Sequence, residues 1–257
     1  MSRRRLTTAL ALASLALGVA LFAAGAPAAL VAVNSLILRA DGGFQPQVLP
    51  RQSYAPIRFQ GYFDIAAKGG GKPVPLQQAV IDFDRDGRLD VNGLPSCQPQ
   101  LVAEATTAAA RQACPNAIVG SGRVEAIVAT GNAVFPISAP LTIFNGPRIG
   151  GDPSAILHAR TGFPEPQTFM IVAPIERRPG RFRYRVTLDA PPIAEDLGSI
   201  SRVEVDIGKR FGPGNKRSYV AARCSDGVLD THGRFTFADG TVIDGSVEKA
   251  CRVKPGS

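Results

Sequence analysis

The sequence that decides the fold is NGLPSCQPQLVAEATTAAARQACPNAIVGSG, residues 92–122. It holds two of the four cysteines, Cys97 and Cys114, and the clearest helical segment of the chain. Thr106 or Thr107 is a suitable N-cap for a short Ala-rich helix, which ends near Cys114 because Pro115 disfavours a helical residue before it. A straight helix between the cysteines would hold them about 25 Å apart. A disulfide between them therefore requires this segment to fold back on itself.

Much of the chain before and after this stretch alternates apolar and polar residues, which is typical of half-buried strands. The pattern is clear in PIRFQGYFDI (56–65), RFRYRVTL (181–188) and ISRVEVDI (200–207). Gly (27) and Pro (21) are frequent, so many turns are expected, and Trp is absent. We therefore predict a single all-β domain over residues 56–254. Its form is an antiparallel sandwich of about 10–12 strands, with one short helix in a disulfide-stapled excursion.

Residues 1–28 have the layout of a secretory signal peptide, with three arginines before an apolar run that ends in small residues. An uncleaved membrane anchor is the alternative, because the run approaches spanning length. The Ala-rich composition and Pro27 favour cleavage, and no Cys follows the run to carry a lipoprotein anchor. We expect a protein that is secreted, or associated with the cell envelope after cleavage.

Between the signal peptide and the β domain, residues 29–55 are predicted as a loosely ordered N-terminal segment. Asp41-Gly42-Gly43 is predicted as a turn, because these residue types favour turns.

The four cysteines predict two disulfides, because pairing is the default for cysteines in an exported protein. Cys97–Cys114 would staple the helical excursion, and Cys224–Cys251 would pin the C-terminus between neighbouring strands. Zinc binding is not expected, because no C-x-x-C motif is present and the chain has two histidines.

Asp82, Asp84 and Asp86 stand at alternate positions before Gly87 and resemble the first half of a calcium-binding loop. The twelfth position of such a loop needs a bidentate acid, and that position is Gly93. The alternative is a hairpin with its turn at Asp86-Gly87, in which Asp82 and Asp84 face solvent. The hairpin interpretation fits more of the motif than the calcium loop does. Calcium is the one cofactor that the sequence suggests.

Arg181, Arg183 and Arg185 share one face of a predicted strand, and Arg177 and Arg178 precede them. Alternate residues lie about 7 Å apart along a strand, a spacing that can follow a polyanion. The net charge is +8, or +5 without the export segment, which fits an anionic cell-envelope polymer or lipid surface as the partner. The alternative is a solvated face whose arginines pair with acids on neighbouring strands, for example residues 200–207. Nucleic acid is not expected as the partner of an exported protein.

His158 and His232 are the two candidates for a general base near neutral pH. Neither stands in a recognisable catalytic motif. We therefore predict a non-catalytic binding or structural protein. One alternative is an exported hydrolase that uses His158 or His232. Another is a carrier of a small apolar ligand, which a large apolar pocket between sheets would favour.

A set of short motifs runs along the chain: Gly93-Leu94-Pro95 before Cys97, Ala117-Ile118-Val119-Gly120 after Cys114, Phe144-Asn145-Gly146, Gly198-Ser199-Ile200, Lys216-Arg217-Ser218-Tyr219 before Cys224, and Phe237-Ala238-Asp239-Gly240. Their order and spacing, from about Pro56 to Cys251, resemble a group of uncharacterised secreted proteins of actinobacterial type. The resemblance implies an exported β fold with both cysteine pairs. It implies no activity, ligand or catalytic residue.

Overall fold

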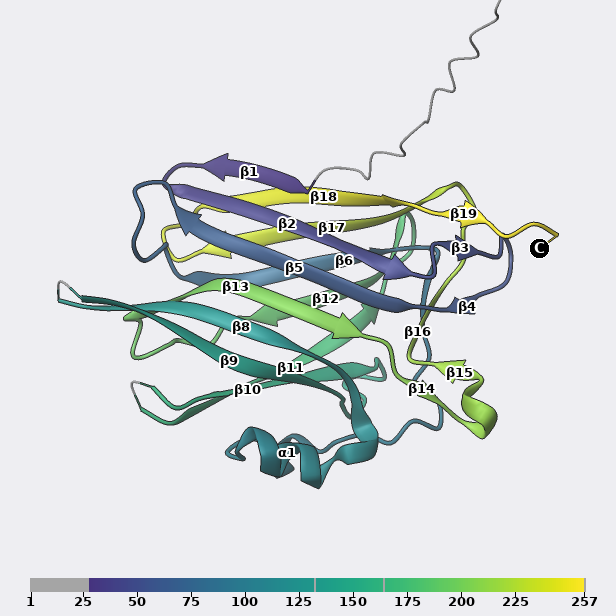
Figure 1. Cartoon of the computed structure of the whole chain (residues 1–257), viewed down its shortest axis with the longest axis horizontal. Helices are drawn as coiled ribbons and strands as arrows, with labels where there is room; N and C mark the ends of the chain where they lie inside the picture. Colours follow the sequence, from purple (N-terminus) through teal and green to yellow (C-terminus); the bar gives the residue numbers. More distant parts are fainter. Residues whose placement is uncertain (1–27, 132, 164, 257) are drawn as a thin grey trace, which may run out of the picture.

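The computed structural model describes residues 28–131, 133–163 and 165–256 (Figure 1). Twelve strands form its main sheet: β1 Ala29–Val33, β2 Leu36–Gln45, β5 Arg58–Ala67, β6 Leu76–Asp84, β8 Ile118–Thr130, β9 Ala133–Asn145, β10 Ser154–Thr161, β11 Gln167–Arg177, β12 Phe182–Asp189, β13 Gly198–Ile207, β17 Val228–Phe237 and β18 Val242–Ala250. The predicted signal peptide lies outside the described residues except for its last position.

The twelve strands pair antiparallel in the order β1-β2-β5-β13-β8-β9-β10-β11-β12-β6-β17-β18. The first and last strands of this order, β1 and β18, contact each other, so the sheet nearly closes into a barrel. The predicted all-β antiparallel fold is confirmed. The two layers of the sandwich are the opposite walls of this one curved sheet (Figure 1).

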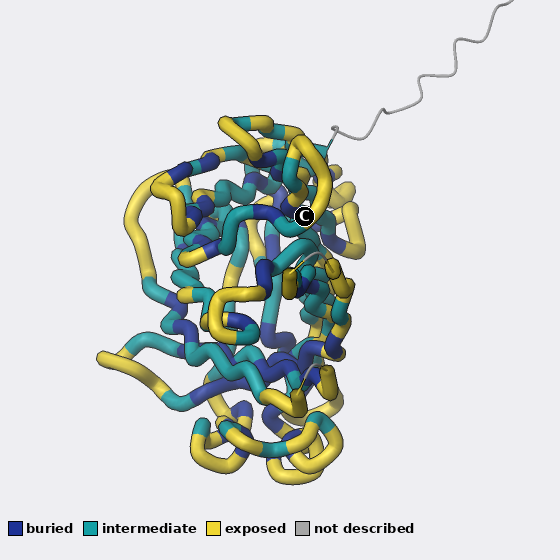
Figure 2. The backbone as a smooth tube through the Cα atoms, turned by 90° about the vertical axis from the view of Figure 1, so that its left-hand side faces the viewer, coloured by how far each residue is buried: buried dark blue, intermediate teal, exposed yellow. Residues whose placement is uncertain are grey.

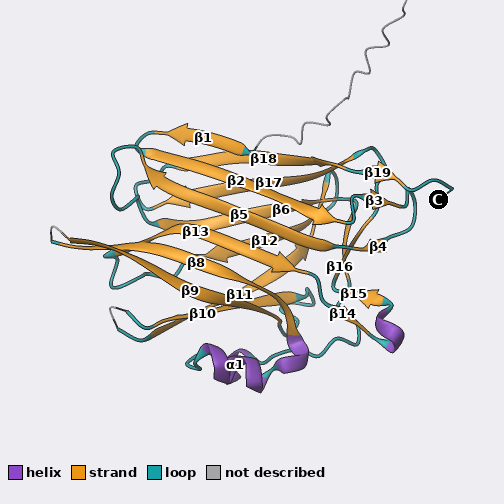
Figure 3. Cartoon of the chain, in the orientation of Figure 1, coloured by secondary structure: helices purple, strands orange, loops and turns teal. Residues whose placement is uncertain are grey.

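The remaining elements are short and lie outside the barrel wall. The strands are β3 Val48–Leu49, β4 Ala55–Pro56, β7 Gly87–Leu89, β14 Arg210–Phe211, β15 Arg217–Ser218, β16 Val220–Ala222 and β19 Arg252–Val253. The helices are α1 Thr107–Ala113 and the 3₁₀ turns η1 Pro99–Leu101, η2 Pro115–Ala117 and η3 Pro213–Asn215. Figure 3 shows α1 outside the sheet, where it contacts β9 and β10.

Alternation along the strands places apolar side chains inside the barrel, and buried positions recur along the strands while exposed positions gather in loops (Figure 2). On β9, Ala139, Leu141 and Ile143 are buried, whereas Pro136 and Pro140 are exposed. The neighbouring β10 pairs with β9 only from Leu141 onward. The two prolines therefore lie where β9 has a free edge, as expected for residues that lack an N–H donor.

The helical excursion has the predicted construction. The Thr106 hydroxyl caps α1 by accepting a hydrogen bond from the backbone N–H of Ala109, at 3.2 Å. Cys97 and Cys114 form a disulfide with their Cα atoms 5.5 Å apart. The excursion covers the outer face of β9 and β10, where it buries Phe144 and Ile156. The second predicted disulfide, Cys224–Cys251, is also present.

The structure differs from the prediction for residues 29–55. β2 pairs with β5 over ten positions, and Leu36 and Leu38 are fully or almost fully buried. Asp41-Gly42-Gly43 is part of this strand and not a turn. A Cβ atom at Gly42 would lie 2.8 Å from the carbonyl oxygen of Gln60 on β5. The glycine is there because the two strands approach closely, not because the chain reverses.

Candidate functional site

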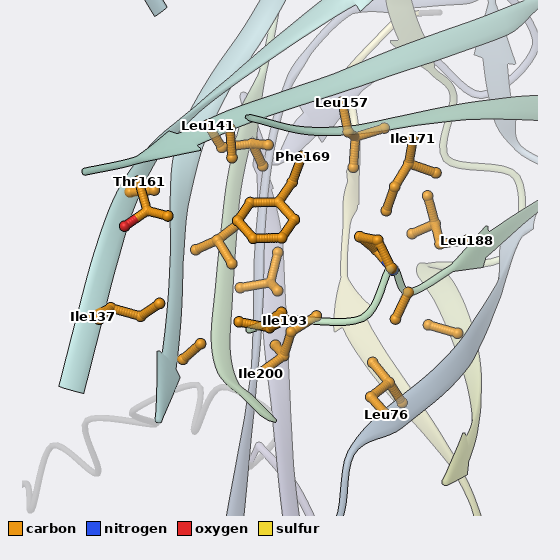
Figure 4. Close-up of a pocket in the computed structure, with 18 of the residues that line it drawn as sticks. Leu76, Ile137, Leu141, Leu157, Thr161, Phe169, Ile171, Leu188, Ile193 and Ile200 are labelled. Carbon is orange, nitrogen blue, oxygen red and sulfur yellow. The ribbon is translucent and has the colours of Figure 1, made fainter. Parts of the chain in front are cut away.

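The barrel encloses an apolar cavity near the end formed by the β5–β6, β8–β9, β10–β11 and β12–β13 connections (Figure 4). The space open to the centre of a water-sized sphere is ≈ 100 Å³. Inward side chains of β5, β6 and β8 to β13 line it. Figure 4 shows Phe169 near its centre with Ile193 beside it, and Ile137 and Leu188 on opposite walls.

Two lining residues, Ser138 and Thr161, carry polar side-chain atoms, and both hydroxyls already have protein partners. The Ser138 hydroxyl accepts from Arg123 Nη1 at 3.0 Å. The Thr161 hydroxyl donates to the carbonyl oxygen of Phe163 at 2.9 Å and accepts from the N–H of the same residue at 3.2 Å. The cavity therefore offers a ligand apolar contacts and no free side-chain hydrogen-bonding group.

The β12–β13 connection, residues 190–197, closes this end of the barrel. Ile193 is buried among Ala126, Val128 and their apolar neighbours. Its carbonyl oxygen accepts from the N–H of Gly198 at 2.9 Å. Outside this connection, the rings of Phe135 and Phe163 pack edge to face with their centroids 5.7 Å apart, and both residues are exposed. The end of the cavity is thus covered by side chains and not by a continuous layer of strands.

Beside the cavity, two neighbouring strands of the barrel wall, β11 and β12, are only partly paired. β11 and β12 pair only at Ile175–Val186, Glu176–Arg185 and Arg177–Tyr184. Pro174 precedes the paired stretch on β11 and cannot donate a ladder hydrogen bond. From there toward the cavity end the two strands are not paired.

The predicted arginine stripe is divided by the structure. Arg185 donates to both carboxylate oxygens of Asp82, each at 2.8 Å, and Arg181 forms ion pairs with Asp230 and with Glu248. The partners come from β6, β17 and β18. The acidic face of residues 200–207 is not involved. Two of the five arginines are therefore neutralised on the barrel surface.

The other three arginines of the stripe lie apart from these pairs. The Nη1 atom of Arg178 is 3.8 Å from Oε2 of Glu176, and Arg177 is exposed at the end of β11. Arg183 donates to the hydroxyl of Tyr54 at 2.6 Å. The five arginines that the sequence places in one stripe thus have five different sets of neighbours.

The Asp-rich motif turns the chain at the predicted place but does not form a hairpin, because β7 pairs with β16 and not with β6. Asp82 is buried against Arg185 and does not face solvent. Asp84 accepts from the backbone N–H groups of Asp86 at 2.7 Å and Asp230 at 3.0 Å, and burial raises its pKa. Among the described residues, no group of three or more His, Cys, Asp or Glu is arranged to hold a metal ion. Calcium remains an untested prediction.

His158 lies on the outer face of β10 beneath the helical excursion and is fully buried. Its Nε2 is 3.1 Å from the carbonyl oxygen of Ala105, and its Nδ1 has no hydrogen-bond partner among the described residues. Burial lowers the pKa of His158, and this outweighs the nearby carbonyl groups, which raise it. The residue is placed to hold the excursion on the sheet and has no access to a substrate.

His232 lies on the outer face of β17, in register with Asp82 on β6 and Ser246 on β18. Its Nδ1 is 3.9 Å from Oδ2 of Asp82, and its Nε2 is 4.0 Å from Oδ1 of Asp244. Both distances are too long for hydrogen bonds. The Asp82 carboxylate is already occupied by Arg185. A carboxylate that orients a catalytic histidine is therefore not available here in the present arrangement.

The residues of the cavity carry only a faint signal in the sequence. Alternation indicates which side chains face inward, but it does not show which of them meet across a curved sheet. The signal that points to a cavity is alanine at inward positions on four strands, namely Ala79, Ala126, Ala139 and Ala159. Small side chains there leave space that larger ones would fill.

Comparisons with known proteins found no match: no family model fits the chain, and no curated protein or solved structure is significantly similar to it. In the part of the chain that the structure describes, no helix has the length and apolar character needed to cross a membrane.

Proposed function

We propose that the protein is a non-catalytic binding protein that holds a small apolar ligand inside its barrel. The cavity carries this proposal, because its lining is apolar and its two hydroxyl groups are already hydrogen-bonded. Apolar ligand surface removed from water in such a site contributes about 25 cal/mol per Å². A polar group on the ligand would have to remain at the mouth, near Ile193, because the interior offers it no partner.

The proposal includes a location outside the cytosol, either secreted or associated with the cell envelope. Two disulfides support an oxidising compartment. The signal-like composition of residues 1–28 supports export. The exported-hydrolase alternative has less support, because His158 is fully buried and the carboxylate nearest to His232 is bound to Arg185.

The test is a calorimetric titration of the protein with benzene, a neutral apolar probe whose size suits a small apolar cavity. We expect saturable binding that the substitution Ala126→Leu weakens by about tenfold or more, since the larger side chain occupies much of a cavity of ≈ 100 Å³. Ala129→Leu is the matched control. Ala129 lies on the same strand but does not line the cavity, and we expect this variant to bind benzene as the parent protein does.

Thermal unfolding of both variants shows whether the added side chains are accommodated. Absence of saturable binding, or equal affinity in the Ala126→Leu variant, would show that the cavity is not a ligand site.

A further inference from the structure

Three guanidinium groups surround one tyrosine ring on the barrel surface. The Cζ atoms of Arg88 and Arg183 are each 5.5 Å from the ring centroid of Tyr54, and that of Arg223 is 5.3 Å from it. All three lie over the ring, which has two faces, so at least two of the guanidinium groups share a face. The three arginines come from β7, β12 and the segment after β16, which are far apart in the sequence.

The small sheet β4-β16-β7 brings part of this group together. Ala222 on β16 pairs with Ala55 on one side and with Gly87 on the other. The adjacent residues, Tyr54 and Arg223, therefore lie side by side. Barrel strand β12 adds Arg183, whose Nη1 donates to the Tyr54 hydroxyl at 2.6 Å.

Asp86 fixes the position of Arg223. Asp86 is fully buried and accepts from Arg223 Nε at 2.8 Å and from the N–H of Ser225 at 2.7 Å. A guanidinium group held through its Nε keeps its outer nitrogen atoms available as donors. The buried carboxylate thus orients this arginine while leaving part of its donor surface free.

Two of the three arginines form no ion pair within the described part of the chain. Arg223 is paired with Asp86, whereas neither Arg88 nor Arg183 forms an ion pair with a described residue. Asp90 stands two residues from Arg88, but both of its carboxylate oxygens accept hydrogen bonds from Arg217. Two cations beside the same ring repel each other unless an anion lies between them. Arg183, which has no ion pair, therefore differs from Arg181 and Arg185, whose charges are neutralised by carboxylates.

We propose that Arg88, Arg183, Arg223 and Tyr54 form a binding site for a phosphate group. A guanidinium group presents a planar fork of donors that matches an oxyanion. A carboxylate has two oxygen atoms, which one fork can occupy, whereas a phosphate group has enough oxygen atoms to accept from several guanidinium groups at once. The site shares no residue with the apolar cavity, so it is independent of the function proposed above.

The first experiment measures thermal unfolding in inorganic phosphate, compared with chloride at equal ionic strength. We expect a saturable rise in Tm that is specific to phosphate, because a ligand that binds the folded state stabilises it. Arg88→Gln and Arg183→Gln should each weaken the derived phosphate affinity tenfold or more. Arg58→Gln is the matched control, because Arg58 is exposed and pairs with Asp206 elsewhere on the barrel, and its phosphate affinity should be unchanged. Arg88 is exposed, so its substitution should not impair folding.

The second experiment identifies the source of the phosphate group. The protein is sedimented with vesicles of phosphatidylcholine alone and with vesicles that also contain phosphatidic acid. Binding to phosphatidic acid that Arg88→Gln abolishes and Arg58→Gln retains would assign the site to a lipid headgroup. A phosphate-specific Tm shift without sedimentation would assign it to a soluble phosphate or phosphate ester. If phosphate acts no differently from chloride, or acts equally on the Arg88→Gln variant, the proposal is overturned.

Discussion

At the residue scale, His158 links the stability of the fold to pH. It is fully buried, and burial lowers its pKa below the unfolded value of about 6.5. Folding therefore favours the neutral ring. The resulting stability is complete above the unfolded pKa and is lost as pH falls below it, by up to about 1.4 kcal/mol per pH unit.

We predict that His158→Gln flattens the decline in unfolding free energy between pH 7 and pH 5.5. Glutamine does not titrate and keeps a donor that can reach the carbonyl oxygen of Ala105. His232→Gln is the control, because the chain has only these two histidines. Urea unfolding across this pH range measures both variants. An unchanged slope in the His158→Gln variant would show that the buried ring does not cause the decline.

At the element scale, the connection between β12 and β13 has an unusual backbone. Ala194, Glu195 and Asp196 have φ angles of 49°, 53° and 70°, and the N–H of Leu197 closes the turn on the carbonyl oxygen of Ala194 at 3.0 Å. Consecutive non-glycine residues in the left-handed region are costly. This turn places Ile193 in the end of the barrel, so backbone strain and the closure of the cavity belong to the same short segment.

We predict that Ala194→Gly stabilises the protein by about 0.5–1 kcal/mol, because glycine adopts positive φ without steric cost. Ala238→Gly is the control. Ala238 is an exposed turn residue without positive φ, and there the gain in unfolded-state freedom should destabilise the protein slightly. Chemical denaturation gives both values. Destabilisation at both positions would mean that the left-handed turn carries no strain.

Local patterns account for what the sequence predicts correctly at this scale. Thr106 and Pro115 delimit the helix through capping and proline geometry, which depend on neighbours in the chain. The reading of Gly42 as a turn fails because the glycine serves a contact with β5, far along the sequence. Tyr54 has no local signal at all. Its three arginines come from segments far apart in the sequence, and only the fold brings them to the ring.

At the scale of the whole molecule, the barrel is held at its periphery by two covalent links. Cys97–Cys114 ties the excursion to the outer face of β9 and β10. Cys224–Cys251 joins the segment after β16 to the end of β18. None of these cysteines lines the cavity. The disulfides and the proposed ligand cavity are therefore located in separate parts of the fold.

We predict that replacing either pair with alanine lowers the unfolding free energy by about 3 kcal/mol, since each link closes a loop of moderate length in the unfolded chain. The loops span 17 and 27 positions, so the two losses should be similar in size. Benzene affinity at temperatures where the variants remain folded should not change, because none of the four cysteines lines the cavity. Equal melting temperatures for the reduced and oxidised protein would contradict the first expectation. A loss of benzene binding in a folded variant would contradict the second, and would mean that the peripheral links also set the shape of the barrel.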